Sequence, residues 1–284
     1  MKTQGLFSKV MLVFGFLFLY VPILSMIFFS FNDSRSVTVW NSVTSPTLKW
    51  YVRLFGDTQV LNAAWLSIRV AAMSATGAVV LGTLAGLVLA RFGPFKGRAF
   101  LQGLTTAPLV MPEVITGLSM LLLFVSLEQL MQYMFGWQFD RGVVTITIAH
   151  ITFTMAYVTV VVQSRLAGFD DSLEEAALDL GARPAKVFFR ITVPLILPAI
   201  LSGWLLAFTL SWDDVVITQF VSGPGSSTLP MVIFSRVRLG VNPVVNALAT
   251  LMVLIVALGV ILSAVVMRRQ EQRRKREEQM AATG

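Results

Sequence analysis

Residues 170–194 read DDSLEEAALDLGARPAKVFFRITVP, and this stretch has the features of two short helices joined by a glycine. Three residues at its start can cap a helix N-terminus: Asp170, Asp171 and Ser172. Apolar residues then recur at helical spacing and form one face: Leu173, Ala176, Ala177 and Leu180. Gly181 stands where a helix C-cap requires left-handed backbone, and Pro184 suits the first turn of a second helix.

The apolar face of this helix pair admits two interpretations. Ala176 and Ala177 are small enough for another protein surface to approach closely, so the pair can be a docking surface. Alternatively, the pair is an amphipathic hairpin packed against the rest of its own chain. The residues alone leave both open.

Apolar segments flank this stretch on both sides and determine the class of the protein. Hydrophobic residues make up 56% of the 284 residues and charged residues 13%, whereas soluble domains carry about 25% charged residues. Each segment is long enough to cross a hydrocarbon core about 30 Å thick. We therefore predict an all-α, polytopic membrane protein, one transmembrane domain over residues 1–284, with six spans at about 10–31, 62–90, 99–126, 143–164, 196–220 and 244–267.

The Lys and Arg residues between these spans fall unevenly on the two sides of the membrane. Fifteen of the 22 stand on the side that holds both termini: Lys2, Lys9, Arg91, Lys96, Arg98, Arg165, Arg183, Lys186, Arg190, Arg268, Arg269, Arg273, Arg274, Lys275 and Arg276. Because cytoplasmic loops carry the excess of basic residues, we expect both termini and residues 170–194 in the cytoplasm. In the longest external loop, residues 32–61, the stretch Lys49 to Phe55 is expected to lie flat on the outer surface.

Composition also excludes several kinds of site. There is no cysteine, and His150 is the one histidine, so a disulfide, a Cys-ligated metal site and a site built from several histidines are excluded. The net charge of +7 reflects membrane topology and does not predict nucleic-acid binding. No G-x-x-x-x-G-K-[ST] loop is present, so we expect ATP and Mg²⁺ in a separate chain and no cofactor on this one.

Ionisable residues inside the predicted spans are candidates for function, because they are costly at membrane depth. They are Glu113, His150, Asp213 and Asp214. Near Glu113, Pro108 and Pro112 are expected to break the third helix and free backbone carbonyls that need protein or water partners. We expect His150 to be a hydrogen-bonded packing residue.

The three carboxylates admit two interpretations. Each can be paired inside the protein, for instance Glu113 with Arg69, or they can line a pathway for a cation. In the second case Phe208 and Trp212 would supply aromatic faces that attract ammonium groups, which would suit a flexible diamine or polyamine. Carboxylates do not suit an anion path.

The cytoplasmic stretch resembles the EAA motif of ABC-importer permeases, which reads E-A-A, three residues, G, nine residues, I, one residue and L-P. The residues that carry the resemblance are Glu175, Ala176, Ala177, Gly181, Ile191 and Pro194, and the sequence departs only at Val193, where the family usually has leucine. The resemblance implies the fold of type I ABC-importer permeases. It also implies that residues 170–194 are the coupling helices that contact the ATPase.

Two further stretches are similar to the spermidine/putrescine importer permeases: APLVMPEVITG at 107–117, and FTLSWDD at 208–214 followed by FVSGPG at 220–225 and TLP at 228–230. Trp212 departs from that family, where a small aliphatic residue is expected. The resemblance implies an inner-membrane permease for putrescine or spermidine, working with a second permease, two ATPase subunits and a periplasmic polyamine-binding protein. The alternatives are the same architecture for another cation or a metal ion, and a secondary transporter acting alone.

Overall fold

The computed structural model describes residues 5–34, 39–138, 140–168, 172–240, 243–258, 261 and 265, and all regular structure in this part of the chain is helical. The all-α prediction is therefore confirmed. The chain divides into two compact units, one formed by Gln59–Phe234 and the other by Met1–Thr58 with Ser235–Gly284.

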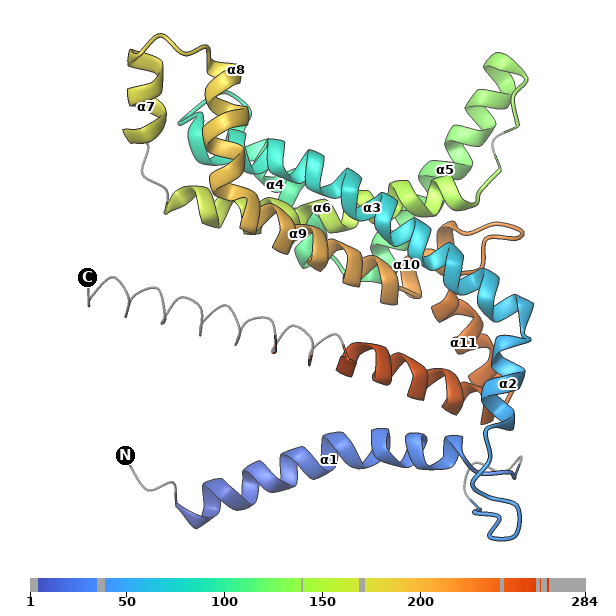
Figure 1. The fold of residues 1–284 in the computed structure, drawn as a ribbon. Coiled ribbons are helices and arrows are strands. Elements are labelled where there is room, and N and C mark those ends of the chain that lie inside the picture. The colour runs from blue at the N-terminus through green and yellow to red at the C-terminus, as the bar shows by residue number, and fades with distance from the viewer. Residues whose placement is uncertain are drawn as a thin grey trace. The chain divides into compact units, whose positions relative to one another are not determined.

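The unit of residues 59–234 contains most of the helices (Figure 1). They are α3 (Thr58–Arg91), α4 (Arg98–Val110), α5 (Glu113–Phe135), α6 (Val143–Ala167), α7 (Ser172–Asp179), α8 (Pro184–Val187), the π-helical turn η1 (Phe188–Thr192), α9 (Val193–Asp213), α10 (Val216–Val221) and the first residues of α11 (Leu229–Arg238).

Close contacts between small residues hold α3, α6 and α9 together. A Cβ added at Gly82 of α3 would lie 2.9 Å from the Met155 carbonyl oxygen of α6, and one at Gly203 of α9 would lie 3.3 Å from Val158. Helices in membranes associate in this way, because lipid offers no hydrophobic driving force and close packing replaces it. Ala75, Ala78, Val158, Val162 and Ala207 fill the contact between the three helices.

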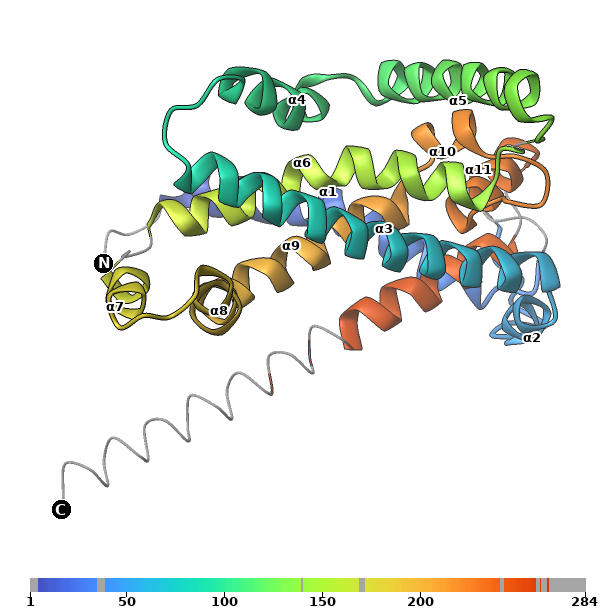
Figure 2. The ribbon, with the colours of Figure 1, turned by 90° about the horizontal axis from the view of Figure 1, so that it is seen from above.

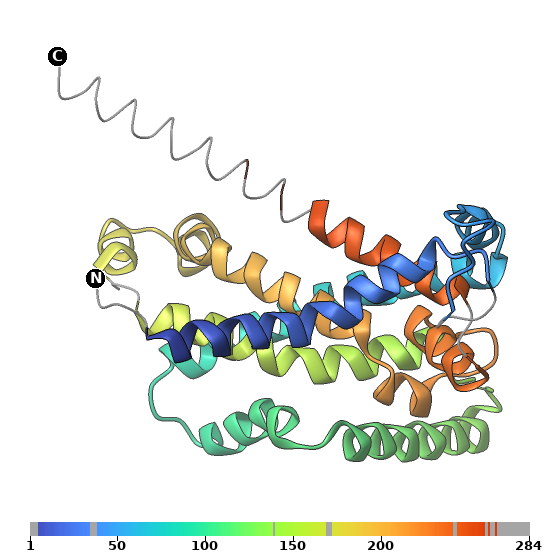
Figure 3. The ribbon, with the colours of Figure 1, turned by 90° about the horizontal axis from the view of Figure 1, so that it is seen from below.

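The third predicted span is two helices. The chain breaks at Met111, which has extended backbone (φ −77°, ψ 134°), and Pro112 precedes α5. Pro108 lies inside α4 and does not break it. Figures 2 and 3 show α4 and α5 as successive helices along one edge of this unit. Of these two helices, only α5 is long and apolar enough to cross a membrane.

The two ends of this unit differ. The ends of α3 and α6 that carry Arg91 and Ala167 meet α7 and α8, whereas α10 and the start of α11 lie at the opposite end (Figure 3). Helices α8, η1 and α9 form one continuous helix, Pro184–Asp213. Pro194 and Pro198 both lie inside this helix, and neither interrupts it.

The other unit contains α1 (Leu6–Ser30), α2 (Lys49–Phe55) and the helix Pro243–Leu258. Helix α2 coincides with the stretch expected at the outer surface. The indole of Trp50 is 2% exposed, and its Nε1 donates to the Asn32 carbonyl over 2.6 Å. The Asn32 side chain in turn donates to the Val39 carbonyl over 2.7 Å, so two buried polar side chains fix the loop between α1 and α2.

Five helices in the described residues are long and apolar enough to cross a membrane: Leu6–Ser30, Thr58–Arg91, Glu113–Phe135, Val143–Ala167 and Pro184–Asp213. The sixth predicted span is represented by the shorter apolar helix Pro243–Leu258. Three predicted features lie outside the described residues: most of the sixth span beyond residue 258, the tail after Met267, and the capping candidates Asp170 and Asp171.

Candidate functional site

Asp214 is a buried capping residue at the break between α9 and α10. Helix α9 ends at Asp213, and Asp214 has extended backbone. The Asp214 carboxylate accepts hydrogen bonds from the backbone N–H of Ile217 (3.2 Å) and of Thr218 (2.8 Å), and from the Thr218 hydroxyl (2.7 Å). These bonds satisfy donors at the start of α10 that have no partner within the helix.

His150 completes this buried network from α6. Its ring is 1% exposed, with Nδ1 2.6 Å from the Ser211 hydroxyl and Nε2 3.2 Å from the Asp214 carboxylate and 3.0 Å from the Thr218 hydroxyl. The structure agrees with the expectation of a hydrogen-bonded packing residue. It also shows that the Asp pair is divided, because Asp214 is paired inside the protein.

Asp213 and Glu113, by contrast, are exposed at the ends of their helices. Glu113 is the first residue of α5, and the next turn of that helix packs on α10, where a Cβ at Gly117 would lie 3.3 Å from the Ile217 Cα. Among the residues that the structure describes, no ion pair joins Glu113 to Arg69. The alternative in which these two neutralise each other is not formed.

Aromatic rings are stacked along α9, leading to its Asp213 end. The ring centroids of Trp204 and Phe208 lie 5.3 Å apart at 19°, and those of Phe208 and Trp212 lie 6.0 Å apart at 16°. Trp204 Nε1 donates to the Thr76 hydroxyl of α3 over 3.1 Å. The sequence interpretation missed Trp204, although its spacing of four residues from Phe208 is the signal that would have revealed it.

The turn after α7 is built as predicted. Gly181 has φ +81°, its N–H donates to the Leu178 carbonyl over 2.9 Å, and the Ala182 N–H donates to the Ala177 carbonyl over 3.0 Å. This pair of bonds is a Schellman motif, which requires left-handed backbone at the glycine position. Pro184 is the first residue of α8, as expected.

Helix α7 turns its apolar residues outward. Leu173 is 55% exposed and Leu180 is 89% exposed, and Glu175 and Ala176 are exposed between them. Within the described part of the unit of residues 59–234, these side chains are therefore not covered by another helix. Ile191 and Pro194 lie farther along, in η1 and α9.

Glu174 connects α7 to the rest of the unit, a role that the sequence interpretation missed. Its Oε1 accepts a hydrogen bond from the Thr192 hydroxyl over 2.7 Å and lies 3.6 Å from the Arg91 guanidinium at the end of α3. A movement imposed on α7 therefore has a polar connection to α3 and to the continuous helix that contains α9.

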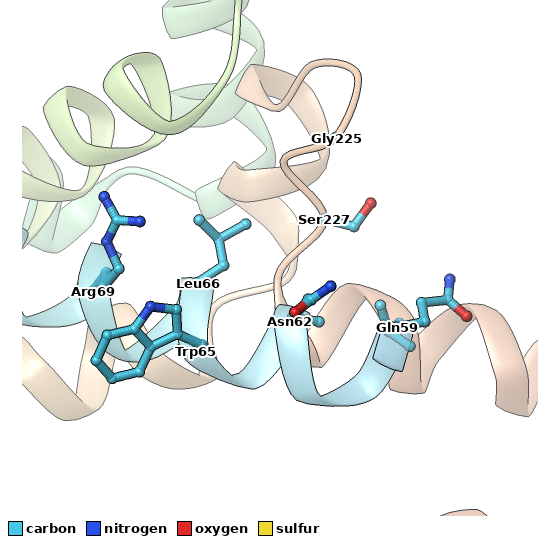
Figure 4. A pocket seen from close by; sticks show the side chains of 9 residues that line it. Gln59, Asn62, Trp65, Leu66, Arg69, Gly225 and Ser227 are labelled. Carbon is cyan, nitrogen blue, oxygen red and sulfur yellow. The ribbon is translucent and has the colours of Figure 1, made fainter. Parts of the chain in front are cut away.

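A pocket of about 480 Å³ lies at the other end of α3 (Figure 4). The first three turns of α3 form one wall, and the segment between α10 and α11 forms the other. The lining residues are Gln59, Asn62, Ala63, Trp65, Leu66, Arg69, Gly225, Ser227 and Val232. A second pocket, of about 250 Å³, lies near the C-terminal end of α5 and is lined by Glu128, Asp140, Arg141, Gly223 and Pro224.

Comparison with known proteins identifies the family to which the chain is related. Residues 78–276 match the family described as binding-protein-dependent transport system inner membrane component. The chain is 57% identical, over 85% of its length and 84% of the relative, to the putrescine transport system permease protein PotI of Escherichia coli. It is 40% identical, over 87% of its length and 88% of the relative, to the spermidine/putrescine transport system permease protein PotC of the same species.

Solved structures share the fold at low sequence identity. A bacterial ABC transporter that imports the acidic polysaccharide alginate matches with a TM-score of 0.70 at 16% identity, covering 91% of this chain and 95% of the other. The MetNI methionine ABC transporter in an inward-facing conformation matches with a TM-score of 0.56 at 15% identity, covering 72% and 92%.

Proposed function

The chain belongs to the binding-protein-dependent transport system inner membrane components, and from this membership we propose that it is one permease of an ATP-driven importer of putrescine, spermidine or both. It is a non-catalytic, multi-pass protein of the inner membrane, as its relatives are. The observation that carries the substrate class is the 57% identity to a permease whose name states putrescine transport.

The carboxylates support a cationic substrate. Asp213 and Glu113 are exposed, and both adjoin the packed region of α5 and α10. Phe208 and Trp212, stacked on α9, offer ring faces to an ammonium group. We assign Glu113, Asp213, Phe208 and Trp212 to the substrate pathway. Asp214, also expected there, acts instead by holding the break between α9 and α10 in place.

We further propose that α7 and the turn after it couple this chain to an ATPase subunit. Glu175, Ala176 and Ala177 would contact the ATPase, Gly181 would fix the turn, and Ile191 and Pro194 would belong to the helix that is moved. The exposure of Leu173 and Leu180 supports this, because an apolar face that does not pack on its own chain suits a partner surface. Closure of the ATPase pair would then carry the spans as rigid bodies between inward-facing and outward-facing states.

The remaining partners follow from the same proposal. A second, homologous permease would complete the pathway, two ATPase subunits would hold ATP and Mg²⁺, and a periplasmic binding protein would deliver the polyamine. Both termini and α7 would lie in the cytoplasm. The segment between α10 and α11 would then face the periplasm, because it lies at the opposite end of α3.

Uptake by the reconstituted complex tests this proposal. The two permeases and the ATPase are placed in vesicles with the binding protein outside, and uptake of labelled putrescine is measured with and without ATP. We expect ATP-dependent uptake that unlabelled spermidine or putrescine reduces and that a neutral diol of the same length does not. Uptake without ATP would overturn the importer assignment, and uptake insensitive to either polyamine would overturn the substrate class.

A further inference from the structure

The length of α3 indicates that the pocket in Figure 4 lies outside the hydrocarbon core of the membrane. Helix α3 has 34 residues and is therefore about 50 Å long at 1.5 Å per residue, well beyond a core of about 30 Å. Its uncharged stretch, residues 70–90, is itself about 30 Å long and accounts for the crossing. The crossing is therefore shorter than the predicted span at about 62–90. Gln59, Asn62, Trp65 and Arg69 precede it, so the pocket they line opens toward water.

The charge in this pocket is positive. Arg69 is the one charged residue that lines it, and it is exposed. Within the described part of the chain its guanidinium has no ion-pair partner. Asn62 and Ser227 add hydrogen-bonding groups, and the Trp65 side chain, 62% exposed, forms an apolar wall (Figure 4). A planar guanidinium with such neighbours is suited to a carboxylate, which it can bind through two parallel hydrogen bonds.

The transported cation does not fit this pocket, because Arg69 repels an ammonium group at close range. We propose that the pocket receives a carboxylate side chain of the substrate-binding protein when that protein docks on the outer face. This inference rests on the proposed function, in particular on the orientation that places α3's first turns in the periplasm.

A protein that docks and leaves suits the pocket better than a permanent subunit does. Obligate interfaces are more hydrophobic than transient ones, whereas this pocket adds the exposed guanidinium of Arg69, two amides and a hydroxyl to the apolar side chains of Ala63, Trp65, Leu66 and Val232. Its volume of about 480 Å³ accommodates the tip of a loop rather than a single ion. Exposed Gly225 and Ser227 form one wall, so a docking protein reaches it without entering the helix bundle.

The test measures binding of the purified, putrescine-loaded binding protein to the complete permease–ATPase complex in nanodiscs. Arg69→Glu is expected to weaken this binding about tenfold or more, and Arg69→Gln less, because reversal adds repulsion to the lost pair. Arg69→Lys is expected to retain part of the affinity, since it keeps the charge but not the paired hydrogen bonds. The matched control is Arg141→Gln, which removes a positive charge at the second pocket and is expected to leave binding within about twofold.

Two further measurements separate the outcomes. Raising the salt concentration is expected to weaken binding of the wild-type complex more than that of Arg69→Gln, because screening acts on the charge pair. Changing the binding protein's acidic residues to lysine one at a time is expected to yield a variant that restores binding to Arg69→Glu. If Arg69→Glu binds the binding protein with unchanged affinity, the proposal is overturned. The proposal is also overturned if the Arg69→Glu permease no longer co-purifies with the second permease, because the pocket would then belong to the contact between the two permeases.

These results are independent of the substrate class. If the wild-type complex binds its binding protein in an Arg69-dependent way but does not import putrescine, the polyamine proposal fails and the docking pocket stands. If it imports putrescine and Arg69→Glu binds normally, the docking pocket fails alone.

Discussion

Asp213 and Asp214 are adjacent in the chain but have opposite surroundings. Asp213 is exposed, whereas Asp214 is buried, and its carboxylate accepts hydrogen bonds from Thr218 and from Nε2 of His150. The separation arises because the helix stops between them, so the second carboxylate turns inward to cap α10. The exposed carboxylate is therefore accessible, as the proposed substrate role requires, and the buried one supports the structure.

Single substitutions of the two residues are expected to have different effects. Asp214→Ala removes the acceptor of three hydrogen bonds from the start of α10 and of one from His150, which stays buried, so it should lower the free energy of unfolding by about 2–3 kcal/mol. Asp213→Asn should leave thermal stability unchanged and raise the KM for putrescine uptake. Thermal unfolding of the purified complex and uptake kinetics check the two parts. Equal stability of both variants would remove the distinction drawn here.

Sequence reasoning placed Asp213, Asp214 and His150 in the spans, but it could not say which carboxylate is buried. The answer depends on where α9 ends, and no proline or glycine marks that point. Trp204 was missed because aromatic residues in a span are common, although its spacing of four residues from Phe208 was a usable signal and the stacked rings bear that spacing out.

At the scale of elements, the turn that follows α7 carries the most specific local requirement. A β-branched residue at Gly181 would have to adopt left-handed backbone, which costs about 1–2 kcal/mol. Space is not limiting there, since nothing lies within 4 Å of an added Cβ. Gly181→Val should therefore misplace α7 and reduce uptake, while the protein stays in the membrane. Gly181→Asn, which tolerates this backbone, should retain more activity; equal uptake by both would show that backbone conformation is not what matters.

The contact between α3 and α6 provides a matched pair of glycines. An added Cβ at Gly82 would meet the Met155 carbonyl, whereas one at Gly77 would meet only the Ile151 side chain, at Cδ1 (2.6 Å) and Cγ1 (2.9 Å). Gly82→Ala should therefore destabilise by about 1–3 kcal/mol through overpacking. Gly77→Ala should destabilise less, because a side chain can shift more easily than backbone and alanine adds helix propensity. Thermal unfolding of both variants measures the difference, and a destabilisation of the same size at Gly77 would contradict the packing argument.

The helix breaks show how far local rules reach. Gly181 and Pro184 were placed correctly because each satisfies a local backbone rule. In the third predicted span Pro108 and Pro112 looked equivalent, yet the chain breaks only where Met111 precedes Pro112. A proline disfavours helical backbone in the residue before it, and Ala107 before Pro108 stays helical all the same. Packing against other segments decides which of the two prolines ends the helix, and this packing cannot be inferred from the sequence of one segment alone.

At the scale of the whole molecule, the alternation of apolar and basic segments predicted the class of fold, because that class depends on the bilayer, whereas the family was indicated by the resemblance of the E-A-A stretch. The same pattern did not predict the continuous helix Pro184–Asp213, which joins the proposed coupling region to an apolar helix long enough to cross a membrane. It also did not predict the pocket at Arg69, which forms only when α3 and the segment at Gly225 come together. Features that depend on one segment could therefore be predicted from the sequence, whereas features formed by contact between segments could not.

The proposed orientation gives opposite accessibility to the two ends of α3. The chain has no cysteine, so single cysteines can be introduced without a background. We expect Ser227→Cys and Val43→Cys to react with a membrane-impermeant maleimide in cells whose outer membrane has been permeabilised. Ala176→Cys should react only after the inner membrane is opened. All three positions are exposed in the structure, so burial does not account for a difference. The 34 residues of α3 separate Ser227 from Ala176 by more than the thickness of the core, hence labelling of both from the same side would contradict the crossing by α3 as well as the orientation.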